Sequence, residues 1–203
     1  MAEKTDFRKA MKALYGPSVK QGLHLVAVPP MRFLMVDGEG DPNTALDYRD
    51  ALETLYPLAY AIKFASKTEL GRDYVVPPLE GLWWADDMKT FVTREKGKWK
   101  WTMMLMVPEW IGPKMIDAAI AKVAKKKAPK SLGKLRVEVL EEGRAAQVLH
   151  IGSYDDEGPV LKKMHREFIP AQGLTMAGKH HEIYLSDPRR VAAEKLRTVL
   201  RQP

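Results

Sequence analysis

Residues 179–187, KHHEIYLSD, place an acid within a run of residues that favour a β-strand. Alternate residues of a strand point to opposite faces. One face of this strand is formed by His181, Ile183 and Leu185, and the other by His180, Glu182, Tyr184 and Ser186. We expect the first face to pack in the core and the second to carry chemistry. Burial disfavours the charged form of a carboxyl group, so Glu182 could act as a proton donor or a base near neutral pH. If ionised, it could instead bind a cationic aromatic ligand.

Aromatic side chains are numerous enough to surround such an acid. The candidates for the walls of a flat, apolar pocket are Trp84, Tyr184, Trp101, Tyr154, Tyr56 and Tyr60. The candidates for flexible filler between these rings are Met104 and Met106. A pocket of this kind suits a planar hydrophobic molecule. The plainer interpretation of the tryptophans is that they belong to the core, and we expect this of one member of the pair Trp83 and Trp84, because neighbours on a strand face opposite sides.

The same pattern occurs earlier in the chain. An offset of 100 residues aligns LEGLWWADD, residues 79–87, with residues 179–187. The matched positions are Leu82 with Glu182, Trp83 with Ile183, Trp84 with Tyr184, and Asp87 with Asp187. This offset predicts an internal duplication and puts Trp84 in the position of Tyr184.

Plainer roles are also open for the titratable residues. A lone glutamate on a strand is often paired with a cation, and the candidate partners of Glu182 are Arg32, Arg49 and Lys100. Glu157 stands where a helix-capping acid would. His165 lies within a predicted helix, and His150 has the position of an ordinary strand residue.

Hydrophobic periodicity predicts the elements of the first half. A short basic helix over 5–15 and an extended lead-in over 24–28 precede a buried strand over 31–36. A long helix begins near Asp41 and runs to about Ser66, with one apolar stripe formed by Tyr48, Leu52, Leu55, Ala59 and Ile62. Two strands then follow, over 80–85 and 99–107, and a helix opens at Pro113.

The second half repeats this order. Strands are predicted over 135–140 and 144–151, then a helix from about Pro159 to Gly173, and then strands over 180–186 and 196–201. Each half therefore reads strand, helix, strand, strand. This order predicts an α+β fold of duplicated units, with antiparallel sheets, helices on the outside, and a ligand cleft between the pseudo-symmetric halves where the bare sheet faces meet.

Length and composition bound the class of protein. The chain has 203 residues, of which 45% are hydrophobic, enough for one large domain or two small half-domains that share an interface. The absence of cysteine excludes disulfides, thiol nucleophiles and cysteine-ligated zinc. The charged N-terminus lacks the apolar core of a signal peptide, and no apolar run is long enough to span a bilayer. We therefore expect a cytoplasmic protein that does not engage membranes.

A net charge of +7 raises the question of nucleic acid. The densest basic cluster surrounds a helix end and consists of Lys122, Lys125, Lys126, Lys127, Lys130 and Lys134. Cations at a helix C-terminus are typical of a solvated helix end, so we do not expect nucleic acid to be the partner. Common catalytic motifs are also absent: HEIYL lacks the second histidine of HExxH, GEGDPN lacks the third glycine of a dinucleotide fingerprint, and neither GxxxxGK[ST] nor GxSxG occurs.

Several segments together resemble the GyrI-like small-molecule-binding family. They are MRFLMVDGEGDPN, ALETLYPLAYAIKF, PPLEGLWWADD, WKWTMMLMVP, VLHIGSYDDEGPV, GKHHEIYLSDPRR and the closing KLRTVLRQP. The resemblance covers nearly the whole chain from about Pro29. It implies an N-terminal helix and lead-in over 1–28 and a ligand-binding domain over 29–203, with halves of about 29–130 and 131–203.

The resemblance implies binding of hydrophobic, planar or cationic aromatic small molecules. The chain is most similar to a stand-alone subgroup that hydrolyses the cyclopropyl ring of DNA-alkylating cyclopropanoids through an aromatic cage. Glu182 then matches the cleft glutamate of the family, and Trp84, Tyr184 and Trp101 the cage. Such a strained, conjugated ligand needs only positioning and one proton transfer, so we expect neither a metal nor an organic cofactor. Two alternatives stay open: a module that sequesters ligands unchanged, and a protein-interaction role such as gyrase modulation.

Overall fold

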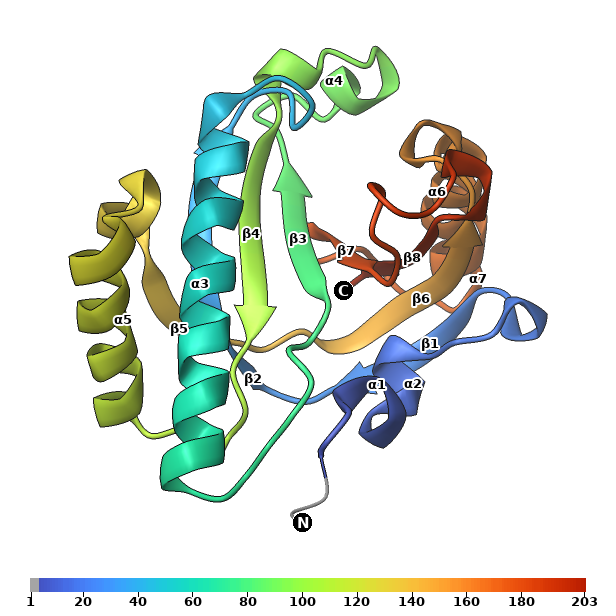
Figure 1. Cartoon of the computed structure of the whole chain (residues 1–203). Helices are drawn as coiled ribbons and strands as arrows, with labels where there is room; N and C mark the ends of the chain where they lie inside the picture. The colour runs from blue at the N-terminus through green and yellow to red at the C-terminus, as the bar shows by residue number, and fades with distance from the viewer. Residues whose placement is uncertain (1–3) are drawn as a thin grey trace.

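A computed structural model describes residues 4–203, whose strands form one eight-stranded sheet (Figure 1). The strand order is β1-β6-β8-β7-β3-β4-β2-β5, and every pair of neighbours is antiparallel. The strands are β1 (His24–Val28), β2 (Met31–Glu39), β3 (Leu79–Trp84), β4 (Lys100–Met106), β5 (Arg136–Leu140), β6 (Gly143–Ile151), β7 (His180–Tyr184) and β8 (Arg197–Gln202). The antiparallel α+β class predicted from the sequence is confirmed, with the halves sharing one continuous sheet.

The helices connect these strands at similar points in the two halves. They are α1 (Phe7–Ala10), α2 (Lys12–Tyr15), α3 (Leu46–Glu69), α4 (Lys89–Val92), α5 (Pro113–Lys127), α6 (Gly158–Lys163) and α7 (Ile169–Ala171), with a π-helical turn over Met164–Phe168 between the last two. Short 3₁₀ turns include Lys96–Lys98 and Tyr154–Asp156. No helix within residues 4–203 is long and apolar enough to cross a membrane.

The duplicated order is visible in the sheet. The first half contributes β2, α3, β3 and β4, and the second contributes β6, the α6–α7 segment, β7 and β8. The halves join where β3 pairs with β7 at the centre of the sheet. Each half also receives an outer strand from beyond its own unit, because β5 pairs with β2 and β1 pairs with β6. The lead-in over 24–28 is therefore an integral edge strand.

Helix α3 forms because its apolar residues recur at spacings of three and four. The predicted stripe is confirmed, since Leu55, Ala59 and Ile62 are buried and Tyr48 and Leu52 pack against the same core. The helix begins at Leu46, five residues later than the expected start at Asp41. Asp41 instead organises a turn, in which its carboxylate accepts hydrogen bonds from the backbone and side chain of Asn43.

The two faces of the sheet are covered differently. Helices α3 and α5 cover one half of one face, and the α6–α7 segment covers the other half of that face (Figure 1). On the second half, Leu200 packs with Met164 and Ile169. The opposite face holds a separate core that includes Leu14 and Tyr15 of the N-terminal segment. That segment is therefore part of the folded core, not the appendage that its basic composition suggests.

A buried ionic network anchors the N-terminal segment to this opposite face. The imidazole of His181 lies 2.9 Å from both Glu80 Oε2 and Glu142 Oε1. Tyr15 Oη donates to Glu80 Oε1 at 2.8 Å, and Arg201 Nη1 donates to Glu142 Oε2 at 3.0 Å. Burial disfavours the charge of His181, yet the two carboxylates outweigh burial and raise its pKa.

Candidate functional site

Glu182 lies at the centre of the sheet, on the face that carries α3 and α6. Its Cα partners are Gly81 of β3 and Leu200 of β8, and its side chain is 14% exposed. Tyr184 Oη donates a hydrogen bond of 2.8 Å to Glu182 Oε2, and Trp83 Nε1 donates one of 2.9 Å to Tyr184 Oη. This chain of donors fixes the orientation of the carboxylate and links the two halves.

Gly81 makes this close arrangement possible. A Cβ atom at residue 81 would lie 2.9 Å from Trp83 Nε1, 3.1 Å from Tyr184 Oη and 3.3 Å from Met103 Sδ. Only a residue without a side chain leaves room for the hydrogen bond from Trp83 to Tyr184 above the strand. The glycine is thus required by packing between strands rather than by a turn.

Aromatic rings from two further segments lie close to Glu182. Tyr154, in the 3₁₀ turn before α6, packs edge-to-face on Tyr184 with ring centroids 5.7 Å apart. Burial and then the charge of Glu182 raise the pKa of Tyr154 to about 12. The same two causes raise the pKa of Tyr48 on α3. Both phenols therefore stay protonated at neutral pH and remain available as hydrogen-bond donors.

A second carboxyl group belongs to this site. Glu157, immediately before α6, is 4% exposed, and its side chain does not cap the helix. Burial, followed by the charge of neighbouring Glu182, raises the pKa of Glu157 to about 10. Two carboxyl groups in one desolvated place cannot both be charged, so Glu157 is the protonated member. We call Tyr48, Trp83, Tyr154, Glu157, Glu182 and Tyr184 the aromatic–acidic cluster.

Two histidines adjoin the aromatic–acidic cluster. His180, two residues before Glu182 on β7, places Nε2 3.5 Å from Glu182 Oε1. The ring of His165 packs edge-to-face on His180 with a centroid separation of 6.2 Å. Burial and the neighbouring His180 lower the pKa of His165 to about 4, so it is neutral at pH 7. His150 lies apart, with its Nε2 donating to the carbonyl of Ser153 at 3.1 Å.

The structure brings together only part of the predicted pocket. Trp84, Met104 and Met106 belong to the core of the opposite face, so they do not accompany Glu182. Trp84 instead lies under Lys179, whose Nζ is 3.2 Å from its ring centroid. Tyr60 is 47% exposed and stacks on Phe64.

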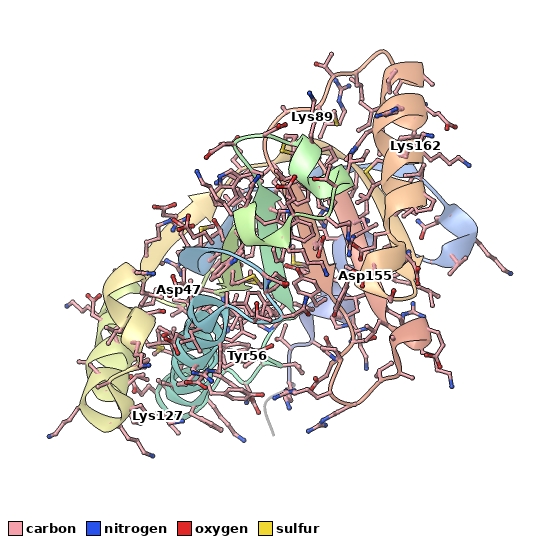
Figure 2. The ribbon with its side chains drawn as sticks, turned by 90° about the horizontal axis from the view of Figure 1, so that it is seen from above. Asp47, Tyr56, Lys89, Lys127, Asp155 and Lys162 are labelled. Carbon is pink, nitrogen blue, oxygen red and sulfur yellow. The ribbon has the colours of Figure 1, made fainter. Side chains whose placement is uncertain are left out.

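Tyr56 and Trp101 lie on the same side of the sheet as Glu182 but outside the aromatic–acidic cluster. Tyr56 is half-buried on α3. Figure 2 labels it in a view from above, together with Asp155 of the turn before α6. Burial raises the pKa of Tyr56. Trp101 is fully buried, packs edge-to-face on Tyr48 at 5.3 Å and lies directly beneath Gly38. It therefore supports Tyr48 from behind.

The predicted equivalence of Trp84 with Tyr184 is wrong, because the two side chains lie on opposite faces of the sheet. In the paired strands Gly81 lies opposite Glu182, and Trp83 and Tyr184 share a face and a hydrogen bond. The residue of β3 that accompanies Tyr184 is therefore Trp83, and Trp84 faces the opposite side of the sheet. A shift of one residue exchanges the two faces of a strand.

The suggested structural partners of Glu182 are engaged elsewhere. Arg32 Nη2 donates to the carbonyl of Pro108 at 3.2 Å, Lys100 pairs with Asp86 at 2.7 Å, and Arg49 lies 3.9 Å from Glu53. The interpretation of Glu182 as one half of an ion pair with these cations was therefore wrong.

Two further features bear on where chemistry could occur. A groove of about 500 Å³ lies between α3 and α5, lined by apolar residues such as Phe64, Trp110 and Met115, and no member of the aromatic–acidic cluster lines it. Within residues 4–203, no group of three or more His, Asp or Glu side chains has the geometry to hold a metal ion. We select the aromatic–acidic cluster as the candidate site because it combines two carboxyl groups with aromatic rings.

The comparison with family models gives the class of this protein. The model for the GyrI-like small molecule binding domain matches residues 23–203. The chain therefore belongs to the GyrI-like family and carries its small-molecule-binding domain. The resemblance seen in the sequence is confirmed. No curated protein sequence matches the chain.

Solved structures refine this picture. A hydrolase encoded by lin2189 from Listeria innocua is 36% identical, with a TM-score of 0.86 over 99% of both chains. A second hydrolase from Listeria innocua is 35% identical, with a TM-score of 0.83 over 98% of this chain and 99% of that one. The C-terminal domain of EcmrR is 12% identical, with a TM-score of 0.55 over 89% of this chain and 95% of its own, and shares the fold alone.

Proposed function

We propose that this protein binds planar, hydrophobic aromatic molecules at the aromatic–acidic cluster and opens a strained ring in them by hydrolysis. The proposed substrates are cyclopropanoid DNA alkylators, in which a cyclopropane is conjugated to a carbonyl group. Ring opening would remove the electrophile and so detoxify the molecule in the cytoplasm. The description of two similar Listeria innocua proteins as hydrolases supports this proposal.

The observation that carries the proposal is the pair of carboxyl groups among aromatic rings. Glu157 is held protonated, whereas Glu182 accepts a hydrogen bond from Tyr184. One carboxyl can therefore give a proton while the other takes one, which is the arrangement that acid–base catalysis requires. The rings of Tyr48, Trp83 and Tyr154 would hold a flat ligand by stacking and edge contacts.

The proposed step balances without another reactant. A water oxygen bonds to a carbon of the cyclopropane as the adjacent ring C–C bond breaks, and the electron pair of that bond moves through the conjugated system to the carbonyl oxygen. Glu182 accepts the proton that the water loses, and Glu157 donates a proton to the carbonyl oxygen. Transfer of a proton from Glu182 to Glu157 then restores the starting pair.

The test is to incubate the protein with a cyclopropanoid alkylator and to follow the ligand by mass spectrometry. The wild type should convert the ligand to a product heavier by one water. Glu182→Gln should lower turnover by about 10²–10⁴-fold and retain binding, because it removes the base and keeps the shape of the side chain. Glu109→Gln, at an exposed position, is the matched control.

Other outcomes would redirect the assignment. Equal turnover by Glu182→Gln and the wild type would reject the role of Glu182. Tight binding with the ligand recovered intact would show a sequestering module, a function for which an acid among aromatic rings is also suited when the ligand is a cationic aromatic.

A further inference from the structure

Two segments that leave the sheet at opposite ends of β7 meet over the face that holds Glu182. The connection from β3 to β4, residues 86–98, starts at the His180 end of β7, because the last residues of β3 pair there. The turn over Tyr154–Asp156 starts at the other end, because β6 ends level with Tyr184. The two starting points are four residues of β7 apart, or about 13 Å.

Ion pairs join these two segments. Arg94 pairs with Asp155, and Lys96 Nζ lies 3.1 Å from Asp155 Oδ1. Asp155 directly follows Tyr154, whose ring packs on Tyr184. The connection from β3 to β4 therefore reaches over the aromatic–acidic cluster and is fixed on its far side.

The same connection contacts the aromatic–acidic cluster through aromatic rings. Phe91 stacks on Trp99 with ring centroids 4.7 Å apart, and Trp99 packs edge-to-face on Trp83 at 6.0 Å. The guanidinium of Arg94 is close enough to Glu157 to oppose the rise in the pKa of that acid. The connection is thus a cover over the site.

A ligand needs this cover to open. Glu157 is 4% exposed and the side chain of Glu182 is 14% exposed, so a planar molecule that contacts both needs one covering element to move. The helical segments on either side are held by fully buried residues such as Leu55 of α3 and Met164. In the β3–β4 connection, which the structure describes throughout, Thr90 alone is buried. The connection is therefore the element that opens with the least loss of packing.

The backbone of Arg94 adds a second indication. Its φ of 60° is left-handed, a conformation that residues other than glycine rarely adopt and that occurs at ligand clamps and switches. We propose that residues 86–98 form a strap that opens to admit the ligand and closes over it, with Arg94 and Lys96 on Asp155 as the latch. This inference rests on the proposed ligand binding at the aromatic–acidic cluster and is independent of hydrolysis.

The absence of cysteine from the chain permits a direct test, because two introduced thiols can be cross-linked selectively. The double variant Arg94→Cys/Asp155→Cys is treated with a short bifunctional methanethiosulfonate, which takes the place of the arginine side chain and is released by reductant. Stopped-flow fluorescence follows the association of ethidium, a planar aromatic cation. The cross-linked protein should bind at least about tenfold more slowly than the reduced protein, because the strap cannot open. The two single-cysteine variants, treated in the same way, are the controls.

Asp155→Asn tests the latch without a cross-link. It removes both ion pairs and should raise the association rate about two- to fivefold, the factor expected for exposed ion pairs. In the free protein, it should also speed amide hydrogen exchange in the strap and leave α3 protected. Glu138→Gln is the matched control, since Glu138 is an exposed acid that pairs with Arg136 on the edge strand β5.

Three outcomes decide the inference. Unchanged association by the cross-linked protein, or equal hydrogen exchange in the strap and α3, would overturn it. Slow association by the treated single-cysteine variants would also overturn it, because closure would not then be the cause. Slow ethidium binding by the cross-linked protein alone, with a wild type that leaves the cyclopropanoid intact, would support the strap and refute the hydrolysis.

Discussion

Gly81→Ala is the most direct test of the donor chain that orients Glu182. The new Cβ would lie 2.9 Å from Trp83 Nε1 and 3.1 Å from Tyr184 Oη, where ordinary van der Waals contacts begin near 3.4 Å. The backbone of residue 81 is not left-handed, so alanine adds no backbone strain. The whole effect must therefore come from displacing the two rings by a few tenths of an ångström.

The size of the effect follows from that displacement. Overpacking of this kind costs about 1–3 kcal/mol of stability, since Met103 and Trp83 are buried and have little room to move. A misplacement of about 1 Å costs roughly 10²-fold in rate, so a smaller shift at Tyr184 should lower turnover about tenfold. Urea unfolding and ligand turnover measure the two quantities, with Gly133→Ala as the control because its Cβ would meet open space. Wild-type stability and turnover in Gly81→Ala would refute the steric argument.

Two further predictions concern the two faces of the sheet. Burial would raise the pKa of Glu142, but His181 and Arg201 outweigh it and hold the pKa at about 2, against an ordinary value of 4.5. Glu142 therefore stabilises the fold above pH 4.5 by about 3 kcal/mol, and this contribution is lost as the pH falls toward 2. In urea unfolding, the free energy of unfolding of Glu142→Gln should fall less steeply over this pH range than that of the wild type. An equally steep fall in the variant would contradict the linkage. Trp83→Phe removes the donor to Tyr184 and should reduce turnover by about 3–10-fold, whereas Trp84→Phe should leave turnover unchanged; the reverse order in a turnover assay would restore Trp84 to the site.

Local periodicity was sufficient for most of the fold. The alternation of β7 correctly placed Glu182 and Tyr184 on one face and Ile183 in the core, because each pattern depends only on residues within one strand. The stripe of α3 was equally readable. The N-terminal segment was not, since Tyr15 is buried through contacts with residues of β3 and β8 that are distant in sequence.

The identity of the aromatic partners depended on register, which a sequence repeat specifies poorly. The offset of 100 residues matched LEGLWWADD to its counterpart by residue type, whereas the residue that donates a hydrogen bond to Tyr184 is Trp83, with Trp84 on the opposite face. Either member of a Trp-Trp pair satisfies a match by type, but only one satisfies the hydrogen bond and the face. Period-two alternation from Gly81, the residue that must be small, would have selected Trp83.

The second acid could not be identified from sequence because its chemistry is created by tertiary contact. Glu157 follows a turn and stands two residues before Pro159, which is the local pattern of an acid that stabilises a helix start. The structure buries this side chain beside Glu182, 25 residues away along the chain, and it is this contact with burial that keeps Glu157 protonated. The same helical segment brings His165 to His180 through a π turn, which has no reliable sequence signature. The acid and the base of the site therefore depend on how α6 docks against β7, and a substitution that shifts this docking should alter both together.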